Sequence, residues 1–463
     1  MKRVIHWFRR DLRLHDNTAL FSALRAAREV IPVYILSEWK GYHRWTGPAR
    51  QQFLSGSLDV LSGNLKKLGG RLIVRQGLAD VELGKLLAET RAEAIFYNRD
   101  PDPFGRQIEQ RVAAAAQSLG ASVHSFKDIA IHERDEVLTG KGEPFRVFTP
   151  YSRAWSKLPK PPVQLAPSAP LSTPLGIYSL SLPTLETWHL EPGAQILPPG
   201  EHAARRRLAA FLRAPILRYG ELRDFPAAAA TSRLSQDLRH GLLSAREVYA
   251  RALATLDCAT PAQALGIRAF INELIWREFY FHILWHWPRV LETDFNPRYH
   301  AVRWYQPGPE FDAWRRGETG FPIVDAAMRQ LTATGFMHNR LRMITAMFLT
   351  KDLHIHWKSG ESHFMQHLVD GEIASNNGGW QWSAGTGADA APYFRIQNPW
   401  TQSRRFDPQA TFIKEWLPEL RDIPPGLLFK PPAPGRSLCP GYPPPIVDHG
   451  SERKTALLMF RQP

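Results

Sequence analysis

Five short apolar runs, rich in β-branched residues, alternate with longer stretches of helical pattern over residues 1–130. The runs read RVIHWF, VIPVYIL, RLIVRQG, AIFYNRD and SVHSF. This alternation predicts βαβ units, and therefore a parallel sheet covered on both faces by helices. Ligands of such sheets bind at the carboxyl ends of the strands. No G-x-G-x-x-G or P-loop motif follows any run, so we do not expect dinucleotide binding of the usual kind in this domain.

The rest of the chain changes character twice. Residues 131–200 are rich in Pro, Ser and Leu, which disfavours helices, and we predict an interdomain linker that runs over the surface in extended segments. From residue 201, apolar residues recur at helical spacing, which predicts a helical domain over residues 201–463. The predicted fold is thus of the α/β class, with a Rossmann-like parallel-sheet domain over residues 1–130 and an all-helical second domain.

The charge balance indicates a polyanionic partner. The chain has 58 Lys and Arg against 44 Asp and Glu, which gives a net charge of +14 and a pI near 9.9. Such a surface attracts polyanions at long range, and nucleic acid is the commonest of these for an intracellular protein. A basic enzyme without a polyanionic partner is the alternative.

We expect neither a metal site nor a secreted or membrane protein. Cys258 and Cys439 are far apart, which excludes a disulfide scaffold and a Cys-based zinc site and fits a reducing cytoplasm. His354 and His356 would point apart on a helix, so we interpret them as solvated or packed side chains. The N-terminus lacks the apolar run of a signal peptide, and no apolar stretch of 18 residues occurs.

Tryptophan is concentrated in the second half of the chain. Ten of the 15 tryptophans lie beyond residue 270, which suggests stacking surfaces or electron carriers, with helix packing as the alternative. The stretch IASNNGGWQW at 373–382 combines glycine, which allows close backbone approach, with asparagine and tryptophan. It fits either a site for a flat ligand or a glycine turn between two core elements.

Two further patterns suggest nucleotide binding. The segment TSRLS at 231–235 precedes and enters a predicted helix, whose N-terminus favours phosphate; an ordinary helix cap is the alternative. In INELIWREFY, Glu273, Trp276 and Tyr280 fall on one helix face. A carboxylate beside an aromatic ring can bind a nucleobase, although an exposed Glu beside a half-buried Trp gives the same pattern.

The segment MHNRLRMI adds polar residues to a helix. Asn339 and Met343 are four residues apart and share a face, and Arg342 lies next to that face. Asp370 would suit a buried arginine as its partner.

Several long motifs resemble the DNA photolyase and cryptochrome family, and more narrowly its class I cyclobutane pyrimidine dimer photolyases. They are HWFRRDLRLHDNTAL, TSRLS, ELIWREFY, TGFPIVDAAMRQL, MHNRLRMI, LVDGEIASNNGGWQW and PYFRIQNPWTQSRRFDP. The resemblance covers nearly the whole chain and is weakest across residues 155–200. It implies an N-terminal α/β antenna domain, joined by a long loop to a helical domain that holds U-shaped FAD.

The resemblance also implies roles around the flavin. Asn376 would face flavin N5, and Gly378 and Gly379 would let the backbone pass close to the isoalloxazine. Trp382 would point into the substrate cavity. The expected FAD-binding residues are Tyr219, Thr231, Ser232, Arg233, Leu234, Ser235, Arg342, Asp370, Gly371, Glu372 and Asn376.

Three tryptophans match the electron relay of the family. Trp380 would be the first donor to the excited oxidised flavin, and Trp357 and Trp304 would carry the electron from the surface. Together with Glu273 and Asn376, they are the residues to which the resemblance gives a catalytic role.

The same transfer implies a pocket for a flipped dimer. Glu273 would hydrogen-bond the dimer, and Trp276 and Trp382 would flank it. The expected substrate and DNA contacts are Arg223, Glu273, Trp276, Tyr280, Asn339, Arg340, Met343, Trp382 and Gln402. The implied reaction is light-driven: excited reduced FAD gives an electron to the dimer, the ring splits, and the electron returns. The implied enzyme is a cytoplasmic, monomeric deoxyribodipyrimidine photo-lyase that acts on double-stranded DNA.

One motif departs from part of the family. Folate-binding members carry Asn-Glu where this chain reads RDPDPFGRQ, with Phe104 and Gly105. The glutamate that would hold methenyltetrahydrofolate is missing, and PFGR is closer to deazaflavin-binding relatives. The resemblance therefore favours 8-hydroxy-5-deazaflavin over methenyltetrahydrofolate as a second chromophore; another flavin or no second chromophore are the alternatives.

Two other functions compete with repair. A cryptochrome-type light receptor shares the FAD fold, but Asn376 differs from the Asp of plant cryptochromes, and no long tail follows GYPPPIVDHG. MHNR argues against the (6-4) lesion class, which places His in the lesion pocket. A basic nucleotide-binding protein without photochemistry is the third reading; flavin absorption of the purified protein would eliminate it.

Overall fold

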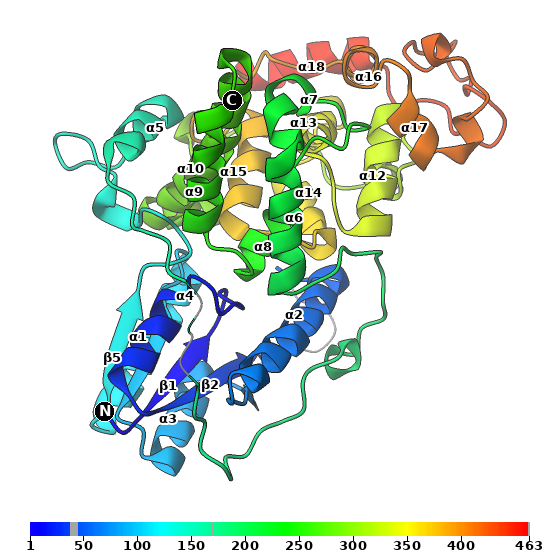
Figure 1. Ribbon diagram of the computed structural model, residues 1–463. Helices are drawn as coiled ribbons and strands as arrows, with labels where there is room; N and C mark the ends of the chain where they lie inside the picture. The colour runs from blue at the N-terminus through cyan, green and yellow to red at the C-terminus, as the bar shows by residue number, and fades with distance from the viewer. Residues whose placement is uncertain (38–44, 166, 168–169, 462–463) are drawn as a thin grey trace.

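The N-terminal part of the chain forms one parallel sheet, at one end of the molecule (Figure 1). The structure is a computed structural model and describes residues 1–37, 45–165, 167 and 170–461. The strand order is β3-β2-β1-β4-β5, and every adjacent pair is parallel. The strands are β1 Arg3–Phe8, β2 Glu29–Leu36, β3 Ile73–Gln76, β4 Ala94–Asn98 and β5 Ser122–Phe126. Each strand coincides with a run predicted as a strand, except that β2 begins one residue earlier, at Glu29.

Helices cover both faces of the sheet, as predicted. Successive side chains of a strand point to opposite faces, so Ile5 and Trp7 of β1 pack in one apolar cluster and Val4 packs in another. The first cluster includes residues of α3 and α4, and the second includes Ala23 of α1. The connecting helices are α1 Thr18–Ala26, α2 Pro48–Lys67, α3 Ala79–Thr90 and α4 Pro103–Ser118.

The strand order reverses between β1 and β4, which is where open α/β sheets form a crevice. Arg9 and Arg10 follow β1, and Asp100 follows β4. Arg10 Nη1 lies 2.9 Å from Asp100 Oδ1, and Arg9 Nη2 lies 3.7 Å from Asp100 Oδ2. The carboxyl edge of the sheet therefore carries a charged cluster at the predicted ligand position.

The C-terminal part is helical, as predicted, and lies at the other end of the molecule (Figure 1). Its α-helices are α6 Glu201–Arg213, α7 Tyr219–Leu222, α8 Ser235–His240, α9 Ala245–Ala254, α10 Pro261–His286, α11 Pro309–Arg316, α12 Pro322–Thr334, α13 Asn339–Met347, α14 Trp357–His367, α15 Ile373–Ala384, α16 Pro399–Phe406, α17 Thr411–Trp416 and α18 His449–Arg461. A π-helical turn, Phe348–Asp352, follows α13. In the described residues, no helix is both long enough and apolar enough to cross a membrane.

The predicted linker contains a helix that the sequence analysis missed. Residues Phe148–Lys157 form α5, and Tyr151 and Trp155 bury its apolar side. Pro150 stands in the first turn, where the backbone N–H that proline lacks would have no helical acceptor. The expectation of extended segments is therefore wrong for α5. It fits residues 170–200 better, since apart from a short 3₁₀ helix, Leu185–Trp188, they run around the outside of the α/β part before entering α6 (Figure 1). The domain boundaries stay a prediction.

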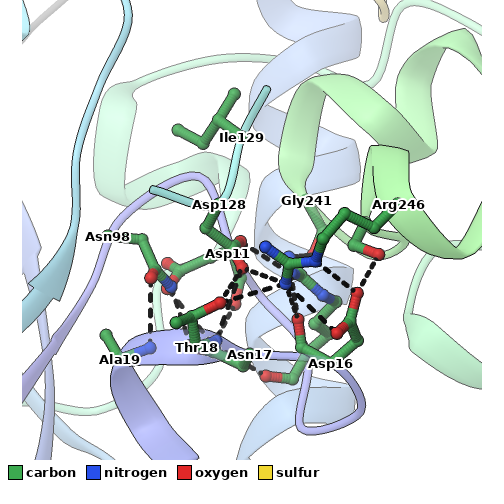
Figure 2. A network of polar contacts seen from close by, with 12 residues as sticks. Asp11, Asp16, Asn17, Thr18, Ala19, Asn98, Asp128, Ile129, Gly241 and Arg246 are labelled. Atoms are coloured by element: carbon green, nitrogen blue, oxygen red, sulfur yellow. Dashed lines mark hydrogen bonds and ion pairs between the residues drawn. The ribbon is translucent and has the colours of Figure 1, made fainter. Parts of the chain in front are cut away.

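A buried polar network joins the two parts of the molecule (Figure 2). Asp128, from the α/β part, accepts hydrogen bonds from Arg13 Nη2 at 2.6 Å and from Arg246 Nη2 at 2.8 Å. Arg246, at the start of α9, also pairs with Asp16, and Ser244 donates to the same carboxylate. All five side chains are buried. Because each charge is paired, the network fixes how the two parts meet.

Candidate active site

A cavity of about 490 Å³ opens in the helical part, between α10, α13 and α15. Most residues expected to bind FAD or the lesion line it. They are Tyr219, Arg223, Ser232, Leu234, Ser235, Glu273, Trp276, Tyr280, Asn339, Arg340, Arg342, Met343, Asp370, Gly371, Glu372, Asn376, Trp380 and Trp382. The fold therefore brings residues from distant motifs to one site.

Helix α10 contributes one wall of this cavity. Thr260 and Gln263 form a capping box at its start, with Pro261 in the first turn, so the helix begins at a defined residue. Glu273, Trp276 and Tyr280 all line the cavity, which confirms that they share a face. The opposite face is buried against the core.

Helix α15 forms another wall of the cavity and contains the stretch IASNNGGWQW. The stretch is helical and not a turn, and Asn376, Gly379, Trp380 and Trp382 line the cavity. A Cβ added at Gly379 would meet nothing within 4 Å. One added at Gly378 would lie 2.1 Å from the Tyr280 ring. Gly378 therefore allows α15 to pack against α10, which differs from the expectation that it serves the flavin.

Buried polar atoms without a partner mark the FAD side of the cavity. Arg342 Nη2 lies 2.8 Å from Asp370 Oδ2, which confirms the expected ion pair. Asp370 Oδ1, Glu372 Oε1 and Trp380 Nε1 are buried and find no hydrogen-bond partner among the described residues. Unpaired buried polar atoms are costly, so they indicate a ligand with both donors and acceptors. FAD has both along its length, so these residues fit it.

Glu273 and Arg223 form an ion pair at the cavity wall. Arg223 Nη1 lies 2.8 Å from Glu273 Oε1, and both side chains are about one-third exposed, at 32% and 37%. Burial raises the pKa of Glu273, although Arg223 opposes this rise. Sequence reasoning assigned both residues to DNA but did not pair them, because they are 50 positions apart. A base that binds Glu273 therefore meets a carboxylate already held by arginine.

Three of the expected FAD and DNA contacts lie outside this cavity. Thr231 and Arg233 belong to the loop before α8; Arg233 has a φ of 52° and lies 3.8 Å above the Phe336 ring. Burial lowers the pKa of Arg233. Gln402, on α16, lines a neighbouring hollow of about 510 Å³, which shares Arg340, Met343 and Trp382 with the main cavity.

The three expected relay tryptophans lie at different depths. Trp380 lines the cavity and is buried, and Trp357 is fully buried, with its Nε1 donating to Asp294 Oδ1 at 2.7 Å. Trp304 is half-buried. The His356 ring lies 5.2 Å from Trp357 and 5.3 Å from Trp304, so aromatic rings link the inner tryptophan to the outer one.

The two histidines near Trp357 are not on a helix, so the helical argument about them is wrong. His356 is the N-cap of α14 and accepts from the Lys358 backbone N–H. His354 has a φ of 55°, and its Nε2 lies 2.7 Å from Glu452 Oε2. Each ring is thus used to fix local structure.

A second cavity, of about 240 Å³, lies at the carboxyl edge of the sheet. Four arginines line it: Arg9, Arg10, Arg50 and Arg239. Arg239 lines the main cavity as well, so it stands between the two. Burial lowers the pKa of Arg239 well below its usual range, and Arg10 and Arg50 lower it further. Arg9 and Arg10 are paired with the carboxylates of Asp100, Glu109 and Glu372, whereas Arg50 and Arg239 donate to backbone carbonyls. The last two guanidinium groups favour an anionic ligand. The sequence pattern predicted the position of this site but not its arginines.

Comparisons with known proteins agree with this architecture. The family model described as "DNA photolyase" matches residues 4–170, and that described as "FAD binding domain of DNA photolyase" matches residues 270–462. A deoxyribodipyrimidine photo-lyase of Synechococcus is 40% identical over 99% of this chain and 96% of its own length. The crystal structure of a class III photolyase from Agrobacterium tumefaciens has a TM-score of 0.92 and 38% identity, and covers 100% of this chain and 97% of its own.

Two other solved structures are similar. A photolyase from Sulfolobus tokodaii, solved with two FAD molecules, has a TM-score of 0.85 and 31% identity and covers 99% of both chains. A cryptochrome from Synechocystis has a TM-score of 0.89 and 29% identity, also over 99% of both chains. The fold and the main cavity therefore define a two-domain FAD-binding protein. The chain belongs to the DNA photolyase family. The class within the family stays a prediction.

Proposed function

We propose that this protein is a light-driven enzyme that repairs cyclobutane pyrimidine dimers in double-stranded DNA. The name of its relatives, deoxyribodipyrimidine photo-lyase, agrees with the expected enzyme class. One observation supports the proposal most directly. The unpaired carboxylate oxygens of Asp370 and Glu372 line the same cavity as three residues expected to bind the lesion, Glu273, Trp276 and Trp382.

The residues of the cavity divide into two groups. Asp370, Glu372 and Asn376 would hold FAD by hydrogen bonds, and Arg342 balances the charge of Asp370. When bound, FAD supplies the light-driven electron transfer that opens the dimer ring. The protein orients the reactants and excludes water. Trp380, with the two relay tryptophans behind it, supplies electrons for flavin reduction.

The second group receives the lesion. A damaged base pair costs less to unstack than an intact one, which favours extrusion of the dimer into the cavity. Trp276 and Trp382 offer flat surfaces, and Glu273 accepts a hydrogen bond from a base N–H. Arg340, which lines both hollows, binds a DNA phosphate, and the net charge of +14 attracts the DNA backbone. The affinity for DNA should therefore fall as the salt concentration rises.

The second cavity is proposed to hold a light-harvesting chromophore. We favour 8-hydroxy-5-deazaflavin over methenyltetrahydrofolate, because Arg50 and Arg239 suit an ionised ring system, PFGR resembles deazaflavin-binding relatives, and the folate-binding glutamate is missing. In the related Sulfolobus tokodaii photolyase, two FAD molecules are present, which implicates a novel light-harvesting cofactor there. Adding each chromophore to the purified protein and recording a shifted absorption band tests this choice. We propose, further, that the enzyme is a cytoplasmic monomer.

A cryptochrome-type receptor is the second candidate, favoured by the similarity to the Synechocystis protein. One experiment separates the two. The flavin-loaded, reduced protein is illuminated with an oligonucleotide that carries one thymine dimer, and recovery of thymine absorbance is followed. Repair by the lit sample, with none in the dark, is expected. Binding of the dimer without repair would favour the receptor.

A further inference from the structure

The indole of Trp276 is stacked on a ring from another part of the chain. Phe148, the first residue of α5, lies with its ring centroid 3.7 Å from that of Trp276 and at an interplanar angle of 6°. Trp276 lines the main cavity, whereas Phe148 does not. One face of the indole is therefore covered by Phe148. We place a flat ligand of the cavity on the other face.

A third ring fixes this pair from the side. Phe279 is fully buried and meets both rings edge-on, at 5.8 Å and 78° from Phe148 and at 5.6 Å and 83° from Trp276. Edge-to-face and stacked arrangements are the favourable geometries for aromatic pairs. Trp276 thus has neighbours that restrict both its tilt and its displacement.

The position of Phe148 is itself fixed by a long-range contact. Val147, the residue before α5, provides no side-chain cap. Asp389, on the loop after α15, takes that place: its Oδ2 accepts from the Phe148 backbone N–H at 3.2 Å. A carboxylate at a helix N-terminus is also favoured by the helix dipole. The start of α5 is therefore tied to the loop that follows the cavity wall.

We propose that Phe148 is a positioning residue for lesion recognition, which holds the plane of Trp276 so that the flipped dimer stacks on a surface already in place. This inference rests on the proposed repair function. A tryptophan side chain left free to change rotamer would have to be ordered when the dimer binds, which weakens binding. The stack removes that cost before DNA arrives. It acts on the extruded bases alone, so it should affect damaged DNA and not intact duplex.

The test compares Phe148→Ala with wild-type protein, both loaded with flavin and kept in the dark. Each is titrated with an oligonucleotide carrying one thymine dimer and with the same sequence undamaged. Because ordering one side chain at an interface costs about 0.5–1.5 kcal/mol, dimer affinity should fall about 2- to 13-fold. Affinity for undamaged DNA and flavin content should not change. Under light, KM for the dimer should rise while kcat stays the same.

Three further variants make the test specific. Phe148→Tyr keeps the stack and should restore dimer affinity. Asp389→Ala frees the start of α5 and should give a smaller loss than Phe148→Ala. Phe145→Ala is the matched control: the Phe145 ring is three residues away and meets Tyr151 at 6.1 Å, and its removal should leave the ratio of dimer to undamaged affinity unchanged.

The outcomes distinguish this inference from the proposal beneath it. Wild-type protein that does not prefer dimer DNA would refute both. If wild type prefers the dimer and Phe148→Ala binds it equally well, only the positioning role fails. If Phe148→Ala loses affinity for both dimer DNA and undamaged DNA, and also loses bound flavin, Phe148 supports only the fold. That result would also overturn the inference.

Discussion

Replacing Asp128 by Asn should strongly destabilise the protein. Asp128 is fully buried and is the acceptor for Arg13 at 2.6 Å, Arg246 at 2.8 Å and the Thr18 hydroxyl at 3.0 Å. Asparagine has the same shape but no charge. The substitution therefore leaves two buried guanidinium groups with less compensating charge, while the packing around the side chain changes little.

The expected loss follows from the geometry. Removing one partner of a buried ion pair costs about 3–5 kcal/mol, because the remaining charge is desolvated and uncompensated. Arg246 keeps a second carboxylate, Asp16, at 3.1 Å, which limits the loss on its side. The remaining hydrogen bonds of Arg13 among the described residues go to backbone carbonyls, and the Asp16 and Asp11 carboxylates act on it only at longer range. We therefore expect a loss of about 3 kcal/mol in the free energy of unfolding, at the lower end of that range.

The assay is urea unfolding of both proteins with flavin at the same saturating concentration, since a ligand adds its own stabilisation. Glu318→Gln is the control, because Glu318 pairs with Arg316 at the surface and should contribute less than about 1 kcal/mol. A loss for Asp128→Asn no larger than the control's would refute the argument that this network carries the interface.

The stability difference between wild type and Asp128→Asn should also depend on pH. Burial raises the pKa of Asp128, but Arg13 and Arg246 outweigh it and hold the pKa below its ordinary value. The carboxylate therefore stabilises the fold above the unfolded-state pKa of about 3.9, and this contribution is lost as the pH falls through the lower folded-state value. The difference between wild type and Asp128→Asn should shrink in acid.

Three further results are expected. Gly378→Ala should lower the free energy of unfolding of the flavin-free protein by about 1–3 kcal/mol, because the added methyl group meets the Tyr280 ring. Gly379→Ala should cause no such loss, because its added methyl group meets no atom within 4 Å. Equal melting curves for the two variants would contradict this. Dimer affinity should fall as the pH drops through the pKa of Glu273, which burial raises above its ordinary value, because the carboxylate is lost. Glu273→Gln should show no such step in a binding titration. Trp304→Phe should slow flavin photoreduction in external reductant but not repair by pre-reduced protein, and an unchanged photoreduction rate would remove Trp304 from the relay.

Local patterns in the sequence were enough for most of the architecture. The strands follow from β-branched runs, and the shared face of Glu273, Trp276 and Tyr280 follows from helical spacing. Helix α5 was missed because prolines surround it, although Pro150 in the first turn is compatible with a helix. The histidine argument failed because a left-handed residue, His354, ends the helical geometry before Trp357.

Pairings between distant residues could not be predicted. Nothing near Arg223 indicates Glu273 as its partner, and nothing near Asp128 indicates Arg246, because both pairs depend on how helices pack. The Phe148–Trp276 stack is of the same kind. Glycine was ambiguous as well: Gly378 and Gly379 are adjacent, yet one faces a packed ring and the other the cavity. Residue type and spacing therefore identified the members of the site but not the contacts that set their chemistry.

Arg239 lines both cavities, and the domain interface sets their relative position. Gly371 and Glu372 line the main cavity, and the arginines of the second cavity hold them from behind. The Gly371 carbonyl accepts from Arg50 Nη1 at 3.0 Å and from Arg239 Nε at 2.9 Å, and the Glu372 carboxylate pairs with Arg10. A Cβ at Gly371 would lie 2.5 Å from Arg50 Nη2, so a larger residue would displace the Arg50 guanidinium group. Because Arg10 and Arg50 come from the α/β part, a shift between the two parts would disturb both sites together. The buried ion pairs at the interface therefore stabilise the active site as well as the fold.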